Sequence, residues 1–94
     1  MDKNKILEVV AVYRQKFEKM EVEKTPFPHN KLLPLLSINL AIAHCYQMLD
    51  QMELFIKEGR TEKTFRWLGF IQGVLWVLGI FSLEDLKNHN RPTK

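Results

Sequence analysis

Hydrophobic residues recur along this chain at intervals of three and four positions, which is the spacing of amphipathic helices. Residues 3–20 form the first such segment, with apolar side chains on one face and basic side chains over much of the other. Residues 21–36 contain three of the four prolines and predict an irregular link, because proline disfavours helix at its own position and at the one before it. We expect Phe27, Leu32 and Leu33 of this link to reach back to the core.

Two longer helices are predicted after the link. The second helix begins near Pro34, which suits a first-turn position, and ends at Gly59, a natural left-handed cap. Its apolar residues form a coiled-coil-like seam: Ile38, Ile42, Cys45, Leu49, Met52 and Ile56. The third helix takes Thr61 as its N-cap and closes at Gly79. Its matching seam is Leu68, Ile71, Leu75 and Leu78. Because the connection between these helices is so short, they must be antiparallel neighbours.

The last segment carries the pattern of a short fourth helix. Ser82 is followed three positions later by Asp85, which is the spacing of a capping box with aspartate in place of glutamate. The helix is predicted over residues 83–89, and Pro92 lies past its end. The fold predicted for residues 1–94 is therefore a single all-α domain, an antiparallel helical hairpin with a packed N-terminal helix and a short C-terminal helix.

Residues 65–81 are apolar all the way round the third helix, so its own chain, a partner chain or lipid must cover every side. The segment is shorter than the about 20 residues that a bilayer requires and carries Gln72 near its middle, which disfavours a membrane span. Gly69 and Gly73 let another backbone approach closely. We expect a homodimer or higher oligomer, because soluble monomers rarely tolerate a large uncovered apolar face. The candidate self-association residues are Trp67, Gly69, Phe70, Gly73, Val74, Trp76 and Val77.

A cluster of polar and basic residues marks the start of the third helix. Free backbone N–H groups and the helix dipole favour an anion at such a place, and basic side chains add to the attraction. The candidate anion-binding residues are Arg60, Thr61, Lys63, Thr64 and Arg66. The alternative interpretation is a solvated helix start whose basic residues pair with Glu58 and Glu62.

Charge and isolated reactive residues narrow the classes of function. The net charge of +3 and the pI of about 9.1 fall short of a nucleic-acid-binding pattern, and the apolar third helix is unlike a DNA-recognition helix. The lone Cys45 fits a reducing cytosol, and no signal peptide is recognised. The three histidines lack metal-ligand spacing, and Asp50 with Glu53 predicts a solvated surface. We therefore predict no catalytic residue, no metal, no cofactor and no sequence-specific nucleic acid partner.

The C-terminal third resembles a known group of proteins. The run RWLGFIQGVLW, then LG, then SLEDLKNHNRP is similar to the C-terminal segment of small uncharacterised proteins encoded by tailed bacteriophages and prophages. The resemblance covers residues 60–92, about a third of the chain. Its polar residues sit at fixed places around the tryptophans: Arg66, Gln72, Asn88, His89, Asn90 and Arg91. The resemblance implies a phage setting, the host cytosol and a non-structural accessory role, with no activity to carry over.

Together these observations predict a non-enzymatic phage accessory protein that binds and modulates a host component, in host takeover or in anti-defence. The component is a host protein met through exposed aromatic residues. The alternative is a sponge for a phosphate-bearing signalling nucleotide, in which the basic helix start supplies the phosphate contacts. A small membrane-associated phage protein is a third interpretation, which the length of residues 65–81 disfavours.

Overall fold

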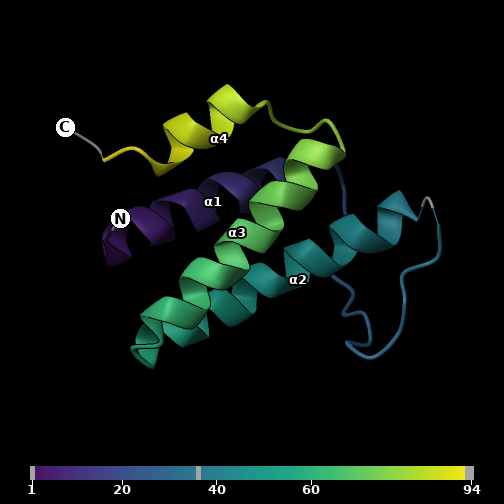
Figure 1. Cartoon of the computed structure of the whole chain (residues 1–94), viewed down its shortest axis with the longest axis horizontal. Helices are drawn as coiled ribbons and strands as arrows, with labels where there is room; N and C mark the ends of the chain where they lie inside the picture. Colours follow the sequence, from purple (N-terminus) through teal and green to yellow (C-terminus); the bar gives the residue numbers. More distant parts are fainter. Residues whose placement is uncertain (1, 36, 93–94) are drawn as a thin grey trace.

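Four helices connected by turns and one long link make up the computed structural model, which describes residues 2–35 and 37–92. The helices are α1 (Lys3–Lys19), α2 (Ile38–Lys57), α3 (Thr61–Val77) and α4 (Leu83–Asn90), and no strand occurs among the described residues. Figure 1 shows α2 and α3 as a hairpin, with α1 packed against α2 and α4 lying along α1. The predicted all-α class and hairpin are thus confirmed.

The core lies where α1, α2 and α3 meet. Each helix contributes the face that its periodicity predicts, because apolar residues three and four positions apart share one side of a helix. The most deeply buried large side chains are Ile6, Tyr13, Phe17, Leu49, Met52, Ile71 and Leu75. Leu86 adds the buried side chain of α4. Burial of a leucine or isoleucine side chain stabilises the fold by about 1.5–3 kcal/mol, so this cluster dominates the stability.

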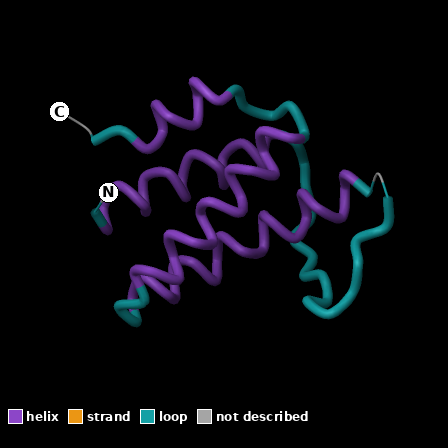
Figure 2. The backbone as a smooth tube through the Cα atoms, viewed as in Figure 1, coloured by secondary structure: helices purple, strands orange, loops and turns teal. Residues whose placement is uncertain are grey.

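The link does not pack as the sequence predicts. Figure 2 shows it as a long loop between α1 and α2. Leu32 is 95% exposed and Leu33 is 42% exposed, so neither reaches the core, whereas Val22 packs against it. Phe27 is half-buried. The link is instead held to α2 at its middle, where Thr25 donates a backbone hydrogen bond to the carbonyl of Ala43 at 3.2 Å.

The start of α2 also differs from the expectation. The backbone N–H of Ser37 donates to the carbonyl of Pro34 at 3.1 Å, so Pro34 begins a turn and not the first turn of the helix. The helix begins at Ile38, whose side chain is 49% exposed and lies outside the seam. The other five seam residues of α2 are buried as predicted: Ile42, Cys45, Leu49, Met52 and Ile56.

The turn between α2 and α3 explains why Thr61 is not the N-cap. Gly59 adopts φ +75°, which favours glycine because it has no Cβ. The next residue, Arg60, donates its N–H to the carbonyl of Phe55 at 2.8 Å and completes the C-terminal motif of α2. Arg60 is at the same time the N-cap of α3, so Thr61 becomes the first helical residue. Because Arg60 serves both the C-terminal motif of α2 and the N-cap of α3, the turn is short.

A polar network joins α4 to the rest of the molecule. The amide of Gln72 donates to the Tyr13 hydroxyl at 3.0 Å and to the side-chain oxygen of Asn90 at 2.7 Å. Asn90 returns a hydrogen bond to Gln72 at 3.1 Å. The predicted capping box is present, because Ser82 and Asp85 exchange hydrogen bonds of 3.0 Å at the start of α4. The cap fixes where α4 begins, and the network fixes where it lies.

Arg14 gives Asp50 and Glu53 a role that the sequence does not predict. One guanidinium nitrogen of Arg14 donates to Asp50 at 2.6 Å, and the other donates to Glu53. Lys24 forms a second ion pair with Asp50 at 3.1 Å. Burial alone would raise the pKa of Asp50, but the hydrogen bonds from Arg14 and Lys24 outweigh it and lower that pKa. The two carboxylates thus tie α1 and the link to α2.

Candidate functional site

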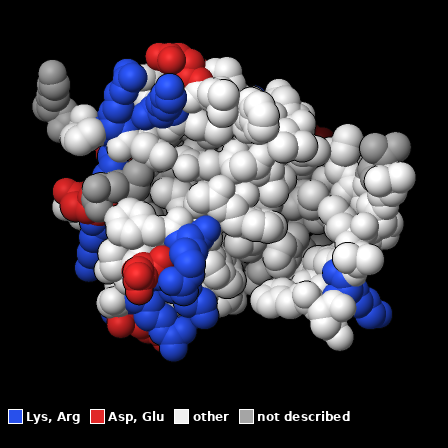
Figure 3. Space-filling view, viewed as in Figure 1, with Lys and Arg blue, Asp and Glu red and all other residues white. Residues whose placement is uncertain are grey.

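The side of α3 that points away from the core is apolar and exposed. Phe70 is 55% exposed, Trp76 is 50% exposed and Val77 is 72% exposed. Between them, Gly69 and Gly73 are open: a Cβ added to either meets no atom within 4 Å. In Figure 3, Lys, Arg, Asp and Glu side chains cluster over the N-terminal part of α3, and the surface over its C-terminal part carries almost none. We call Gly69, Phe70, Gly73, Trp76 and Val77 the outward face of α3.

The other two candidate self-association residues, Trp67 and Val74, lie to one side of that face. Both are half-buried and pack against the core. The Trp67 ring meets the edge of Phe55 with centroids 4.7 Å apart. Trp67 and Val74 also line a groove, and Phe70 of the outward face lines it too, so the predicted set spans two adjoining surfaces.

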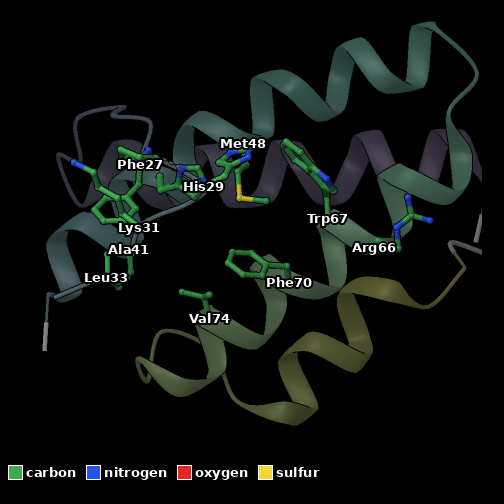
Figure 4. A pocket seen from close by; sticks show the side chains of 12 residues that line it. Phe27, His29, Lys31, Leu33, Ala41, Met48, Arg66, Trp67, Phe70 and Val74 are labelled. Atoms are coloured by element: carbon green, nitrogen blue, oxygen red, sulfur yellow. Dashed lines mark hydrogen bonds between the residues drawn. The ribbon is translucent and has the colours of Figure 1, made fainter. Parts of the chain in front are cut away.

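The groove lies between the link, α2 and α3 and has a volume of about 630 Å³. Figure 4 shows Phe27, His29 and Lys31 of the link at one end and Arg66 with Trp67 at the other. Its aromatic lining comes from all three segments: Phe27, His29, His44, Trp67 and Phe70. The volume is within the about 300–1,000 Å³ typical of small-molecule sites.

Two unpaired cations define the electrostatics of the groove. Lys31 and Arg66 are its charged lining residues, and neither forms an ion pair within residues 2–35 and 37–92. No Asp or Glu from this part of the chain lines the groove. An aromatic surface that carries only positive charge suits a ligand with a flat ring and an anionic group.

His44 is fixed in one form by the link. Its Nδ1 accepts a hydrogen bond from the backbone N–H of Phe27 at 3.0 Å. Burial lowers the pKa of His44, and the neighbouring His29, with ring centroids 5.9 Å apart, lowers it further. Neutral His44 therefore carries its proton on Nε2, which makes this nitrogen a donor.

The predicted anion-binding residues lie in different surroundings. Arg60 pairs with Glu58 at 3.4 Å, as the alternative interpretation predicts, and Lys63 lies 4.5 Å from the Phe55 ring centroid. Thr64 is fully buried and donates its hydroxyl to the carbonyl of Arg60 at 2.8 Å, so its side chain is closed to a ligand. Thr61 is exposed at the helix start. Of the five residues, only Arg66 lines the groove.

The remaining reactive group is a buried thiol. Burial raises the pKa of Cys45 to about 12, which keeps it protonated and unreactive. Among the residues that the structure describes, no three His, Cys, Asp or Glu side chains are grouped to hold a metal ion. No helix in residues 2–35 and 37–92 is both long and apolar enough to span a bilayer.

Sequence reasoning missed the link as a wall of the site. It treated Phe27 and Leu33 as core residues and gave His29, Lys31 and His44 no role. The available signal was composition, because residues 27–33 combine an aromatic, a histidine and a lysine with no acid. Comparison of the chain with protein-family models, with curated proteins and with solved structures finds no match.

Proposed function

We propose that this protein is a non-enzymatic accessory protein of a bacteriophage or prophage that binds and modulates a host component in the host cytosol. The resemblance of residues 60–92 to phage proteins supports the phage setting. Burial keeps the Cys45 thiol protonated, which disfavours its use as a nucleophile and supports binding over catalysis.

The component that fits the groove best is a phosphate-bearing signalling nucleotide, which the protein sequesters and thereby keeps from its host receptor. One observation carries this proposal: five aromatic rings and two unpaired cations line the same open space without a carboxylate. Aromatic side chains stack on bases at about 1–3 kcal/mol per base. Lys31 and Arg66 provide charge-assisted hydrogen bonds for phosphate oxygens. Such binding supports anti-defence, because it removes a signal without any chemical step.

A thermal-shift and fluorescence titration with cyclic mono- and dinucleotides tests the proposal. A tight ligand raises the melting temperature by mass action. In a Trp76→Phe variant, Trp67 is the sole tryptophan and reports on the groove directly. Arg66→Ala should weaken binding by about 1.5–3 kcal/mol, the worth of a hydrogen bond to a charged group. Arg60→Ala is the matched control, because Arg60 pairs with Glu58 outside the groove. Absence of binding by every nucleotide tested would overturn the proposal.

The outward face of α3 is proposed as the contact with a second copy of the chain. The five residues of this face carry no charge, so two copies of a protein with net charge +3 can meet there without placing like charges against each other. An antiparallel pair of α3 helices with Gly73 on a two-fold axis sets Val77 against the partner's Gly69. Gly69 of each copy, which is open, then receives a valine side chain that is exposed in the single chain, and the two Gly73 residues let the backbones approach.

Light scattering at micromolar concentration tests the dimer. The wild-type protein should exceed the chain mass of 11.2 kDa. Gly73→Leu should return it to that mass, because the added side chain blocks the partner, whereas a Cβ at this position meets no atom of its own chain within 4 Å. Leu54→Ser, which removes an exposed leucine from α2, should leave the mass unchanged. If the wild-type protein is a monomer, the dimer proposal is overturned, and the outward face remains available to a host protein.

A further inference from the structure

Two hydrogen bonds hold the link against α2 where it forms a wall of the groove. Thr25 donates to the carbonyl of Ala43 at 3.2 Å, and Phe27 donates to Nδ1 of His44 at 3.0 Å. The first joins two backbone groups and is independent of pH. We propose that His44 is a positioning residue: neutral His44 holds the link in place as the groove wall, and protonation at Nδ1 releases it. The inference rests on the proposed function for its use, but its test does not.

The donor and acceptor in the hydrogen bond between Phe27 and His44 explain why protonation breaks it. A backbone N–H can only donate, so Nδ1 must keep its lone pair to accept from Phe27. A second proton on the imidazole occupies that lone pair and sets two donors against each other. Phe27 is the residue that brings the link into the groove, next to His29 and ahead of Lys31. Loss of this single bond therefore frees the segment that supplies one cation and two aromatic rings.

The charged and titratable groups that line the groove around His44 are all basic. The link contributes His29 and Lys31, and α3 contributes Arg66, all of which line the same groove. On α2 itself, Ala41 and Met48 are the neighbouring lining residues and carry no charge. No carboxylate of the described chain lines the groove to favour the imidazolium. The neutral, link-holding form is thus the stable one at neutral pH, because burial and the neighbouring His29 lower the pKa of His44.

Nuclear magnetic resonance of the ligand-free protein provides the test. Nitrogen shifts of the His44 ring report its tautomer, and the Phe27 amide proton reports the hydrogen bond. Between pH 7.5 and 5 the Phe27 amide should move with the His44 titration in the wild-type protein. In His44→Gln the amide oxygen can still accept, so the Phe27 signal should stay in its bonded position at all pH values. In His44→Ala it should be shifted throughout. His29→Gln is the matched control and should preserve the titration.

Each outcome decides the inference. A Phe27 amide that ignores the His44 titration, or that is the same in His44→Ala and wild type, would overturn it. The nucleotide titration is then repeated at pH 7.5, where His44→Gln, which keeps an acceptor for Phe27, should bind at least tenfold more tightly than His44→Ala, because both variants lack the ring and only one holds the link. Equal binding by His44→Ala and wild type refutes the positioning role. If no nucleotide binds while the Phe27 amide follows His44, the proposed ligand fails and the positioning of the link stands.

Discussion

The Tyr13 hydroxyl lies 3.0 Å from Nδ1 of His89, although the two residues are 76 positions apart. Tyr13 belongs to α1 and His89 to α4, and the tyrosine also accepts from Gln72 of α3. Burial raises the pKa of Tyr13 to about 12, so its hydroxyl keeps a proton that it can donate to His89. One oxygen atom thus connects three helices.

Removal of that oxygen should destabilise the protein. Tyr13→Phe leaves His89 without its partner and the Gln72 amide with only Asn90, and the cost is about 1–2 kcal/mol for lost and unsatisfied hydrogen bonds. Urea denaturation measures the change in the free energy of unfolding. Tyr46→Phe is the control, because Tyr46 is also buried but its hydroxyl makes no hydrogen bond to a described residue. Equal effects of the two substitutions would contradict the role of the network.

The network also predicts how stability depends on pH. Burial lowers the pKa of His89, with Lys5 adding to the effect and Asp85 opposing it. The folded protein therefore binds a proton at His89 less readily than the unfolded chain, whose histidine pKa is about 6.5. The contribution is fully present above that value and is lost as pH falls through the lower folded pKa. Urea denaturation at pH 7.5 and 5 should show a smaller loss of stability for His89→Gln than for wild type.

Two aspartate substitutions on α3 separate the core from the outward face. Leu75 is 1% exposed, and Leu75→Asp should unfold the domain because an unpaired buried charge costs several kcal/mol. Val77 is 72% exposed, so Val77→Asp should keep the helical circular dichroism spectrum while it abolishes the proposed dimer. A folded Leu75→Asp protein would refute the packing of the hairpin.

Glu21 offers a stabilising substitution. It follows α1 at φ +58°, in the left-handed region that disfavours residues with a Cβ. The bond from the N–H of Val22 to the carbonyl of Phe17, at 3.1 Å, shows why this conformation is retained: it closes the C-terminal motif of the helix. Glu21→Gly should raise the free energy of unfolding by about 1 kcal/mol. Glu21→Gln removes the charge but keeps the Cβ, so it should recover less than half of that gain.

Local patterns in the sequence were sufficient to predict the four helices. The periodic apolar faces, the glycines at residues 59 and 79 and the capping box at Ser82 act over a few positions, and each is found where the pattern predicts. The predictions for Pro34 and Thr61 are wrong for a common reason. Considered alone, Pro34 suits the first turn of a helix and Thr61 suits an N-cap. In the structure, the backbone hydrogen bonds of neighbouring residues place the start of each helix elsewhere.

The groove could not be predicted in the same way. Its walls come from residues 27–33, from α2 and from α3, and their proximity depends on how the link returns along the hairpin. The basic cluster at the start of α3 illustrates the difficulty, since consecutive residues of a helix point about 100° apart. Thr64 therefore faces the core while Arg66 faces the groove.

The pairing of α4 with α1 determines the order in which this chain can finish folding. α2 and α3 are neighbours in sequence, so their hairpin closes with little loss of loop entropy. The contact of α1 with α4 spans nearly the whole chain and belongs to the slow, long-range class. On the ribosome, α1 can pack against α2 once both have been synthesised, but its contact with α4 must wait for α4. Until Asn90 has been added, the Tyr13 hydroxyl and the Gln72 amide lack the hydrogen-bond partners that α4 supplies.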